Sequence, residues 1–151
     1  MGFSFPEINF PAYEHKLKKE KDTDYIWDPI RKSWIQLNPE EWVRQNLVRY
    51  LIDDLSYPSG LMQVECKIKV GAIYKRFDLV VMDASLQPWL ICECKAPSVQ
   101  ITQPVLEQAA IYNSTLKCKY LTVTNGLKHY CYEIDFKSGS IQSLPSFPVY
   151  K

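Results

Sequence analysis

Three charged residues lie in apolar runs of the kind that form buried β-strands. Asp78 lies in the run FDLVV, and Glu93 and Lys95 end the run WLICECK. Because side chains alternate along a strand, Glu93 and Lys95 share one face of theirs. A charge on a buried strand is costly unless it is paired or bound to a metal. We therefore expect these three positions to hold either a site for chemistry or a structural ion pair.

Two carboxylates and a lysine on neighbouring strands are what metal-assisted phosphodiester hydrolysis requires. The oxygens of Asp78 and Glu93 suit Mg²⁺, a hard ion that keeps several of its waters, and Mn²⁺ prefers the same ligands. Such an ion polarises the scissile phosphate and lowers the pKa of an attacking water. Lys95 could orient that water or offset the charge that develops on the phosphate. The alternative interpretation, a structural ion pair at the end of the sheet, involves no chemistry.

The elements that must position these residues follow from apolar periodicity and turn signals. The segment NPEE at residues 38–41 predicts a helix start, with Asn38 as N-cap, and helical periodicity continues to Leu55. A second helix is expected from Gln103 to about Asn113. Strands are expected at residues 25–27, 34–37, 62–70, 73–81, 89–95, 119–123 and 129–134. This order predicts an α/β fold in which helices cover a mixed sheet.

The length and composition indicate a single globular domain without a strong overall charge. The chain has 151 residues, of which 46% are hydrophobic, and a formal net charge of +1. We expect residues 1–24 to be a lead-in, residues 25–137 the domain and residues 138–151 an irregular tail. The charged run HKLKKEKD at residues 15–22 is typical of a solvated arm. No secretory signal or membrane-spanning run occurs, so a cytoplasmic protein is expected.

Longer segments around the charged residues resemble a known family. Asp78, fourteen further residues and then Glu93-x-Lys95 resemble the PD-(D/E)XK nuclease motif. The segments PEEWVRQ, RFDLVV, ECKAP, QAAIYN and TNG occur in that order between residues 39 and 126. Together they resemble the nuclease domain at the N-terminus of type I restriction enzyme R subunits (HsdR), over roughly residues 25–134. The resemblance implies a restriction-endonuclease-like fold and DNA cleavage that depends on a divalent metal.

The resemblance also implies roles for individual residues. By motif position, Asp78 and Glu93 would be metal ligands and Lys95 the catalytic lysine. Gln108 and Tyr112 resemble the family's QxxxY element; spaced i, i+4, they share one face of the second helix.

A glutamate of the first helix also borders the site in such enzymes. Glu41 is our choice because it lies on the same helix face as Val48 and Ile52, and Glu40 is the alternative. A solvated acid in the first helical turn, favoured by the helix dipole, would explain Glu41 without any role in the site.

Two departures from the family pattern bear on function. Phe77 stands where the motif has proline, but that position supplies no ligand. The chain also has no GxxxxGK[ST] segment, so it cannot itself drive ATP-dependent translocation along DNA. We therefore expect DNA as a partner, together with a second copy of the chain or a separate motor or specificity subunit.

Four cations follow one another on two neighbouring strands and alternate with apolar residues. A solvated sheet face would explain them, but they are also the best candidates for contacts to DNA phosphates. They are Lys67, Lys69, Lys75 and Arg76.

The leading hypothesis from the sequence is a Mg²⁺-dependent endonuclease of restriction or DNA-defence type. A non-catalytic nucleic-acid-binding or assembly module on a nuclease scaffold is the alternative from another class. An enzyme that acts on RNA or on a small phosphodiester is a third possibility.

Overall fold

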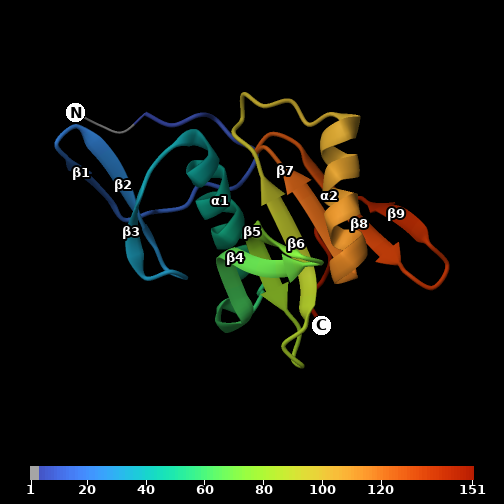
Figure 1. Ribbon diagram of the computed structural model, residues 1–151. Coiled ribbons are helices and arrows are strands. Elements are labelled where there is room, and N and C mark those ends of the chain that lie inside the picture. The colour runs from blue at the N-terminus through green and yellow to red at the C-terminus, as the bar shows by residue number, and fades with distance from the viewer. Residues whose placement is uncertain (1–3) are drawn as a thin grey trace.

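In the computed structural model, which describes residues 4–151 apart from the side chains of Val70 and Thr115, a six-stranded sheet lies between two helices (Figure 1). The strand order is β4-β5-β6-β7-β8-β9; β6 and β7 are parallel and the other neighbours antiparallel. The prediction of a mixed sheet with covering helices is confirmed. The strands are β4 (Met62–Val70), β5 (Ile73–Met82), β6 (Pro88–Cys94), β7 (Tyr120–Thr124), β8 (His129–Asp135) and β9 (Ser140–Leu144).

Helix α1 (Pro39–Arg49) begins where the sequence predicts it. The Asn38 side chain accepts a hydrogen bond from the backbone N–H of Glu41 at 2.7 Å, which satisfies one of the free donors at the helix start. A π-helical turn, Tyr50–Asp54, continues the helix, so the predicted end near Leu55 is also confirmed.

Helix α2 (Gln103–Leu116) connects the two parallel strands β6 and β7. It ends at Lys117, whose φ of 56° lets its N–H bond the Asn113 carbonyl at 2.7 Å. The buried Asn113 side chain then bonds both backbone groups of Cys118, each at 2.9 Å. These bonds fix the turn that leads into β7.

Each helix covers one face of the sheet with its own apolar cluster. On the α1 face, Val43 and Leu47 pack in a cluster that includes Leu79 and Cys92 of the sheet. The α2 face is formed by Phe77, Val80, Ile91 and Leu121, with Ala109, Tyr112 and Leu116 of α2 against them. Of the charged residues of interest, Asp78 lies in the middle of β5, Glu93 near the end of β6 and Lys95 directly after it.

The β4–β5 pair changes faces at one residue. Val64 and its partner Leu79 pack in the α1 cluster, whereas Cys66 and its partner Phe77 pack in the α2 cluster. Strict alternation would put residues two positions apart on the same face. Glu65, between them, has φ of 57°, a left-handed conformation that is unusual for a residue with a side chain. The backbone twist at Glu65 therefore turns the outer part of the pair over.

A separate three-stranded antiparallel sheet precedes α1 and lies beside it in Figure 1. Its strands β2 (Thr23–Asp28) and β3 (Ser33–Gln36) confirm the predicted hairpin. The expected solvated arm instead forms strand β1 (Leu17–Glu20), which pairs with β2. The first three residues of the lead-in lie outside the described part of the chain.

The C-terminal segment also differs from the expectation of an irregular tail, because Ser140–Leu144 forms β9 at the edge of the large sheet. Backbone pairing with β8 makes this polar segment a strand, although its side chains lack the apolar alternation that would predict one. Within residues 4–151, no helix is long and apolar enough to cross a membrane.

Candidate active site

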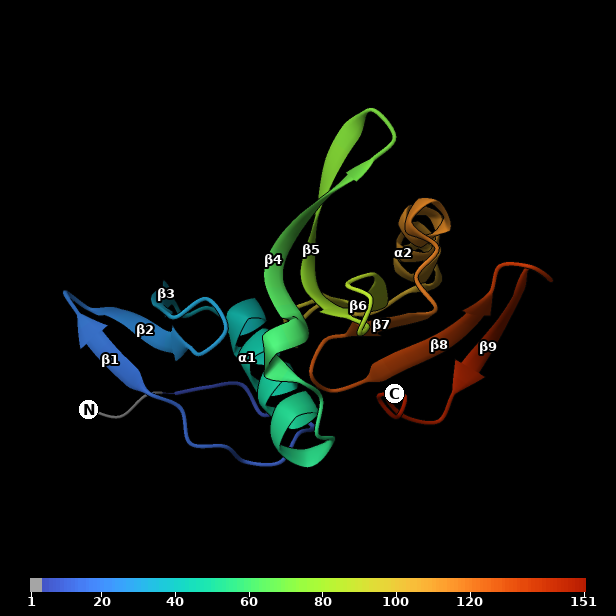
Figure 2. The same cartoon turned by 90° about the horizontal axis from the view of Figure 1, so that it is seen from below.

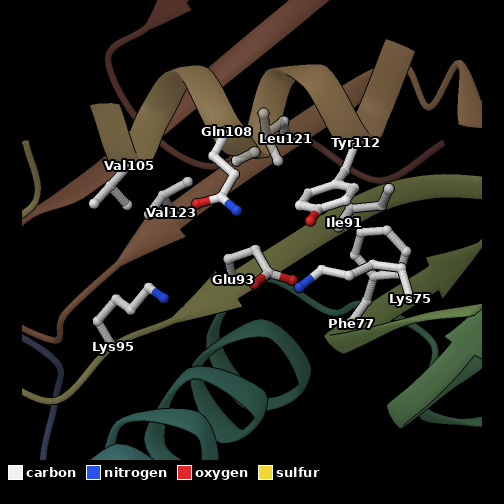
Figure 3. A pocket seen from close by; sticks show the side chains of 11 residues that line it. Lys75, Phe77, Ile91, Glu93, Lys95, Val105, Gln108, Tyr112, Leu121 and Val123 are labelled. Carbon is white, nitrogen blue, oxygen red and sulfur yellow. The ribbon is translucent and has the colours of Figure 1, made fainter. Parts of the chain in front are cut away.

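A pocket of about 170 Å³ lies between α2 and the sheet, and it brings together five of the ten site residues that the sequence singled out: Lys75, Glu93, Lys95, Gln108 and Tyr112. Glu93 and Lys95 enter it from β6 and the residue after it, and Gln108 and Tyr112 enter it from α2. Figure 3 shows Gln108 and Tyr112 pointing from the helix toward Glu93, with Lys75 and Lys95 on either side of that carboxylate. The i, i+4 spacing thus puts both α2 side chains over the same point of the sheet.

Glu93 is the acidic residue of this pocket, and its environment disfavours the charged form. Burial, and then the negative charge of Asp78, raise its pKa to about 7, while Lys75 and Lys95 act in the opposite direction. Its Oε1 atom is buried and has no hydrogen-bond partner among the described residues. A buried oxygen of this kind costs free energy unless a ligand or a proton satisfies it.

Asp78 lies beside Glu93 but is held in a different way. Its Oδ2 atom accepts the backbone N–H of Cys94 at 2.8 Å, and its Oδ1 atom accepts a guanidinium N–H of Arg44, also at 2.8 Å. Burial raises the pKa of Asp78, although the Cys94 N–H and the Arg44 charge both oppose that rise. Asp78 is thus a largely buried carboxylate with a donor on each oxygen.

Arg44 connects Asp78 to two further carboxylates. Its guanidinium bonds both oxygens of Glu41, at 2.6 and 3.1 Å, and also an oxygen of Glu65. Glu41 in turn accepts from Arg31 at 2.9 Å and from Gln45 at 3.0 Å. This ion network, in which Arg44 is almost fully buried, joins the three-stranded sheet to the site through α1.

The two glutamates at the start of α1 therefore have different surroundings. Glu41 is buried in the ion network, and Arg44 holds its pKa below the usual range despite burial. Glu40 is exposed, and partial burial together with the charge of Asp78 raises its pKa, while Lys95 lowers it. Of the two, Glu40 is the one that senses both Asp78 and Lys95, and Glu41 acts on Asp78 only through Arg44.

The four cations of β4 and β5 separate into three environments. Lys75 lines the pocket, with its ammonium group 4.7 Å from the centre of the Tyr112 ring. Arg76 forms an ion pair with Glu65 at 3.3 Å. Lys67 and Lys69 lie farther out on β4 with exposed side chains.

The fit of this site to a hard divalent cation depends on the oxygen donors around the pocket. Within the described residues, no group of three or more His, Cys, Asp or Glu side chains is placed to hold a metal. Asp78 and Glu93 together nevertheless offer oxygen donors, and one Glu93 oxygen is unsatisfied. Mg²⁺ is commonly bound by one or two carboxylates plus waters and substrate phosphate, so this donor set fits that ion.

Sequence reasoning missed Arg44 and Glu65 as members of this site. Arg44 was predicted only to extend the buried face of α1, and Glu65 was not singled out. The signal for Arg44 was present, because Glu41 and Arg44 occupy i and i+3 on a face that is otherwise buried. No signal in the sequence announces the left-handed conformation of Glu65.

Comparison with known proteins identifies a family and a solved structure of similar fold. A family model described as type I restriction enzyme R protein N terminus (HSDR_N) matches residues 39–148. No curated protein matches the chain. A solved structure named "the fragment structure of a putative HsdR subunit of a type I restriction enzyme from Vibrio vulnificus YJ016" is similar in fold. It has a TM-score of 0.52 and 22% sequence identity, over 75% of this chain and 24% of that one, so this chain spans about a quarter of its length.

Proposed function

The chain belongs to the family of type I restriction enzyme R protein N-terminal domains, and we propose that it is a divalent-metal-dependent deoxyribonuclease of restriction or DNA-defence type. The observation that carries this proposal is the unsatisfied Glu93 oxygen in a pocket that also contains Lys95, Gln108 and Tyr112. Buried oxygens without a hydrogen-bond partner are uncommon in folded proteins. Among the described residues the others are Asp24 Oδ1 and Gln45 Oε1, and neither residue lines the pocket.

Asp78, which lies beside the pocket without lining it, and the polar residues of the pocket each have a role that their chemistry supports. Asp78 and Glu93 would hold Mg²⁺ or Mn²⁺, which supplies a Lewis acid that polarises a phosphodiester and makes water more acidic. Lys95 offsets the negative charge that grows on the phosphate oxygens in the transition state. Gln108 and Tyr112 can hydrogen-bond the substrate phosphate or the attacking water from the opposite wall.

Arg44 supports these roles from outside the pocket. It holds Asp78 Oδ1 while the Cys94 N–H holds Oδ2, so the carboxylate keeps one orientation. A ligand that is already oriented loses less entropy when the ion binds. Glu40 is the exposed acid at the start of α1, and partial burial and the charge of Asp78 raise its pKa, so it is the acid of α1 that is open to accept a proton.

Family membership also suggests partners. The chain contains no phosphate loop, whereas the Vibrio HsdR fragment is about four times as long as the part that it shares with this chain. We therefore propose that the motor and the sequence specificity lie outside these 151 residues. Two copies of the domain would be needed to cut both strands of a duplex.

A second candidate function is a non-catalytic nucleic-acid-binding or assembly module. The observation that favours it is that Asp78 already has a donor on each oxygen, with Arg44 in a position where a cation would otherwise be useful. In this alternative, Glu93 is protonated near neutral pH and needs no metal, since its pKa lies near 7.

Metal binding and DNA cleavage, measured together, distinguish the nuclease from the non-catalytic module. We expect calorimetry to detect Mn²⁺ and Mg²⁺ binding by the wild type, and Asp78→Ala and Glu93→Ala to abolish it. Nicking of supercoiled plasmid DNA should require the metal and be lost in Lys95→Ala with unchanged affinity for DNA. RNA and small phosphodiesters, run in parallel, test the substrate class. Absence of metal binding, even with a non-cleavable DNA present, would favour the scaffold function.

A further inference from the structure

The outer half of the β4–β5 pair is a free two-stranded ribbon. The pairing of β5 with β6 begins at Leu79 and Cys92, whereas β4 and β5 stay paired as far as Val70 and Ile73. Residues 66–77 therefore have no third strand. Figure 2 shows this ribbon extending well beyond the rest of the sheet. At about 3.3 Å per residue, the six positions from Glu65 to Val70 give it a reach of roughly 20 Å.

One face of the ribbon packs on the protein and the other does not. Cys66 and Ile68 lie against the α2-side cluster. The cross-strand pairs Lys67–Arg76 and Lys69–Tyr74 alternate with these positions and so lie on the opposite face. This free face begins next to Glu65, where the backbone turns the ribbon over.

The free face is basic. Three of the four cations of residues 66–77, Lys67, Lys69 and Arg76, lie on it, and this segment has no acidic residue although the whole chain is nearly neutral. Among the described residues, Lys67 and Lys69 form no ion pair with a carboxylate; Lys67 lies 5.7 Å from the Tyr74 ring. Tyr74, on this face near the tip, is 63% exposed, and Ile73, on the opposite face, is 60% exposed.

Protection of a sheet edge accounts for part of this pattern only. Lysines on an edge strand discourage pairing with other chains. Both strands are edges in this part of the pair, so edge protection covers the cations of β4 and of β5, but not the apolar side chains at the tip. An exposed isoleucine and tyrosine at the tip also work against solubility unless they contact a partner.

We infer that the β4–β5 ribbon enters the major groove of duplex DNA, with the cations of its free face on the phosphates that border the groove. This inference rests on the proposed function for its choice of DNA as the partner. Two strands about 4.8 Å apart fit a groove about 12 Å wide, but with their side chains they exceed the minor groove, which is about 6 Å wide. The major groove of duplex RNA is too deep and narrow to admit them.

The ribbon and the pocket share strand β5. Lys75 and Phe77 line the pocket, and Asp78 follows Phe77 directly on β5. Lys67, Lys69 and Arg76 lie on the opposite face of the ribbon from these pocket residues, so binding by the free face is measured separately from cleavage at Glu93 and Lys95.

The test measures DNA binding separately from cleavage. Fluorescence anisotropy of the full chain with a labelled DNA duplex, in the presence of a chelator, compares Lys67→Ala/Lys69→Ala with Lys119→Ala/Lys137→Ala. Both double variants remove two exposed lysines; the second pair lies by β7 and in the β8–β9 turn, toward the opposite edge of the sheet. Unchanged melting temperatures verify that each variant folds.

The ribbon variant should reduce the slope of log K against log salt by roughly 2, about one unit for each lost phosphate contact, and the control variant should leave it unchanged. Methylation of guanine N7, which lies in the major groove, should interfere with binding, whereas methylation of adenine N3 in the minor groove should not. Duplex RNA should bind more weakly than DNA.

Equal losses in both double variants, no interference by N7 methylation, or equal affinity for duplex RNA would overturn the inference. Failure of the proposed function looks different. If the ribbon variant weakens binding but the wild type cleaves no DNA with Mg²⁺ or Mn²⁺, groove binding holds and the nuclease proposal fails. If the wild type cleaves DNA and the ribbon variant binds and cleaves normally, the nuclease proposal holds and groove binding fails.

Discussion

The two carboxylates of the site lie side by side on adjacent strands and yet differ in almost every contact. Asp78 has a donor on each oxygen, from Arg44 and from the Cys94 backbone. Glu93 has a buried oxygen with no partner among the described residues, and its pKa rises to about 7. Arg44 of α1 bonds Asp78, whereas Glu93 faces the pocket under α2.

The contrast indicates that the two residues are not equivalent ligands. A carboxylate with fixed donors is already oriented, and a carboxylate with a free buried oxygen gains most when a cation arrives. In our proposal, Asp78 supplies the geometry of the metal site and Glu93 supplies most of the gain in free energy on binding. Four changes can break or sharpen this difference.

The largest effect is expected when Arg44 is removed. Arg44→Met leaves Glu41, Glu65 and Asp78 without their shared cation, and breaking a buried ion network in this way costs about 3–5 kcal/mol of unfolding free energy. Urea denaturation measures it. Arg49→Met, which removes an i, i+4 pair with Asp53 near the surface, is the matched control and should cost less than about 1 kcal/mol. A similar loss of unfolding free energy in both variants would show that the buried network stabilises the fold no more than a surface ion pair does.

Neutral substitutions at the two carboxylates should have opposite signs at pH 8 without metal. Asp78→Asn leaves one of two donors facing an amide NH₂ and should lower the unfolding free energy by about 1–3 kcal/mol. Glu93→Gln removes an unfavourable buried charge and should raise it, by up to roughly 3 kcal/mol for a pKa moved from 4.5 to about 7. Denaturation curves of both variants measure these changes. Unfolding free energies that change in the same direction would contradict the difference between the two carboxylates.

The pH dependence of stability provides a further check on Glu93. Its folded pKa lies above the ordinary value, so the folded state binds this proton more tightly than the unfolded state. The contribution of Glu93 is therefore fully present below about pH 4.5 and is lost as the pH rises through about 7. The stability gap between Glu93→Gln and the wild type should widen over that window. A gap that stays constant from pH 5 to pH 8 would contradict a raised pKa.

The smallest expected effect comes from Lys75. Its charge lowers the pKa of Glu93, so Lys75→Met should raise that pKa further. Asp78→Asn should lower it by a larger amount, because Asp78 exerts the stronger of the two charge effects. Carbon NMR of the Glu93 carboxyl follows both titrations. No movement in Lys75→Met would mean that water screens this lysine from the carboxylate.

Most of the fold was predictable because its elements are local. The cap at Asn38, the turn at Gly71 and the apolar runs around Asp78 and Glu93 each act through near neighbours in the sequence. Strands β1 and β9 were missed because pairing with a neighbouring strand, rather than apolar alternation, defines them.

The candidate site was predictable only in part. The i+2 spacing of Glu93 and Lys95 and the i+4 spacing of Gln108 and Tyr112 translate directly into shared faces, and these four residues do line one pocket. Which glutamate of α1 is turned toward Asp78 depends on the tertiary contact between Arg44 and Asp78. Hydrophobic periodicity does not predict such a contact, because it reports only which residues share a face of one element.

The parallel pairing of β6 with β7 joins the two halves of the six-stranded sheet, and we call this pairing the seam. On one side lie β4, β5 and β6, and on the other β7, β8 and β9, each group joined by short connections that can fold early. Of the strand pairs in this sheet, only β6 and β7 are connected through a helix, α2. The backbone N–H of Lys95 bonds the Thr124 carbonyl of β7 at 2.8 Å, so Lys95 lies at this pairing. The pocket therefore needs both halves, because Glu93 and Lys95 come from one and Gln108 and Tyr112 from the other. A chain cut in the loop at residues 96–102 would give two fragments that each lack part of the pocket, and only their reassociation would restore it.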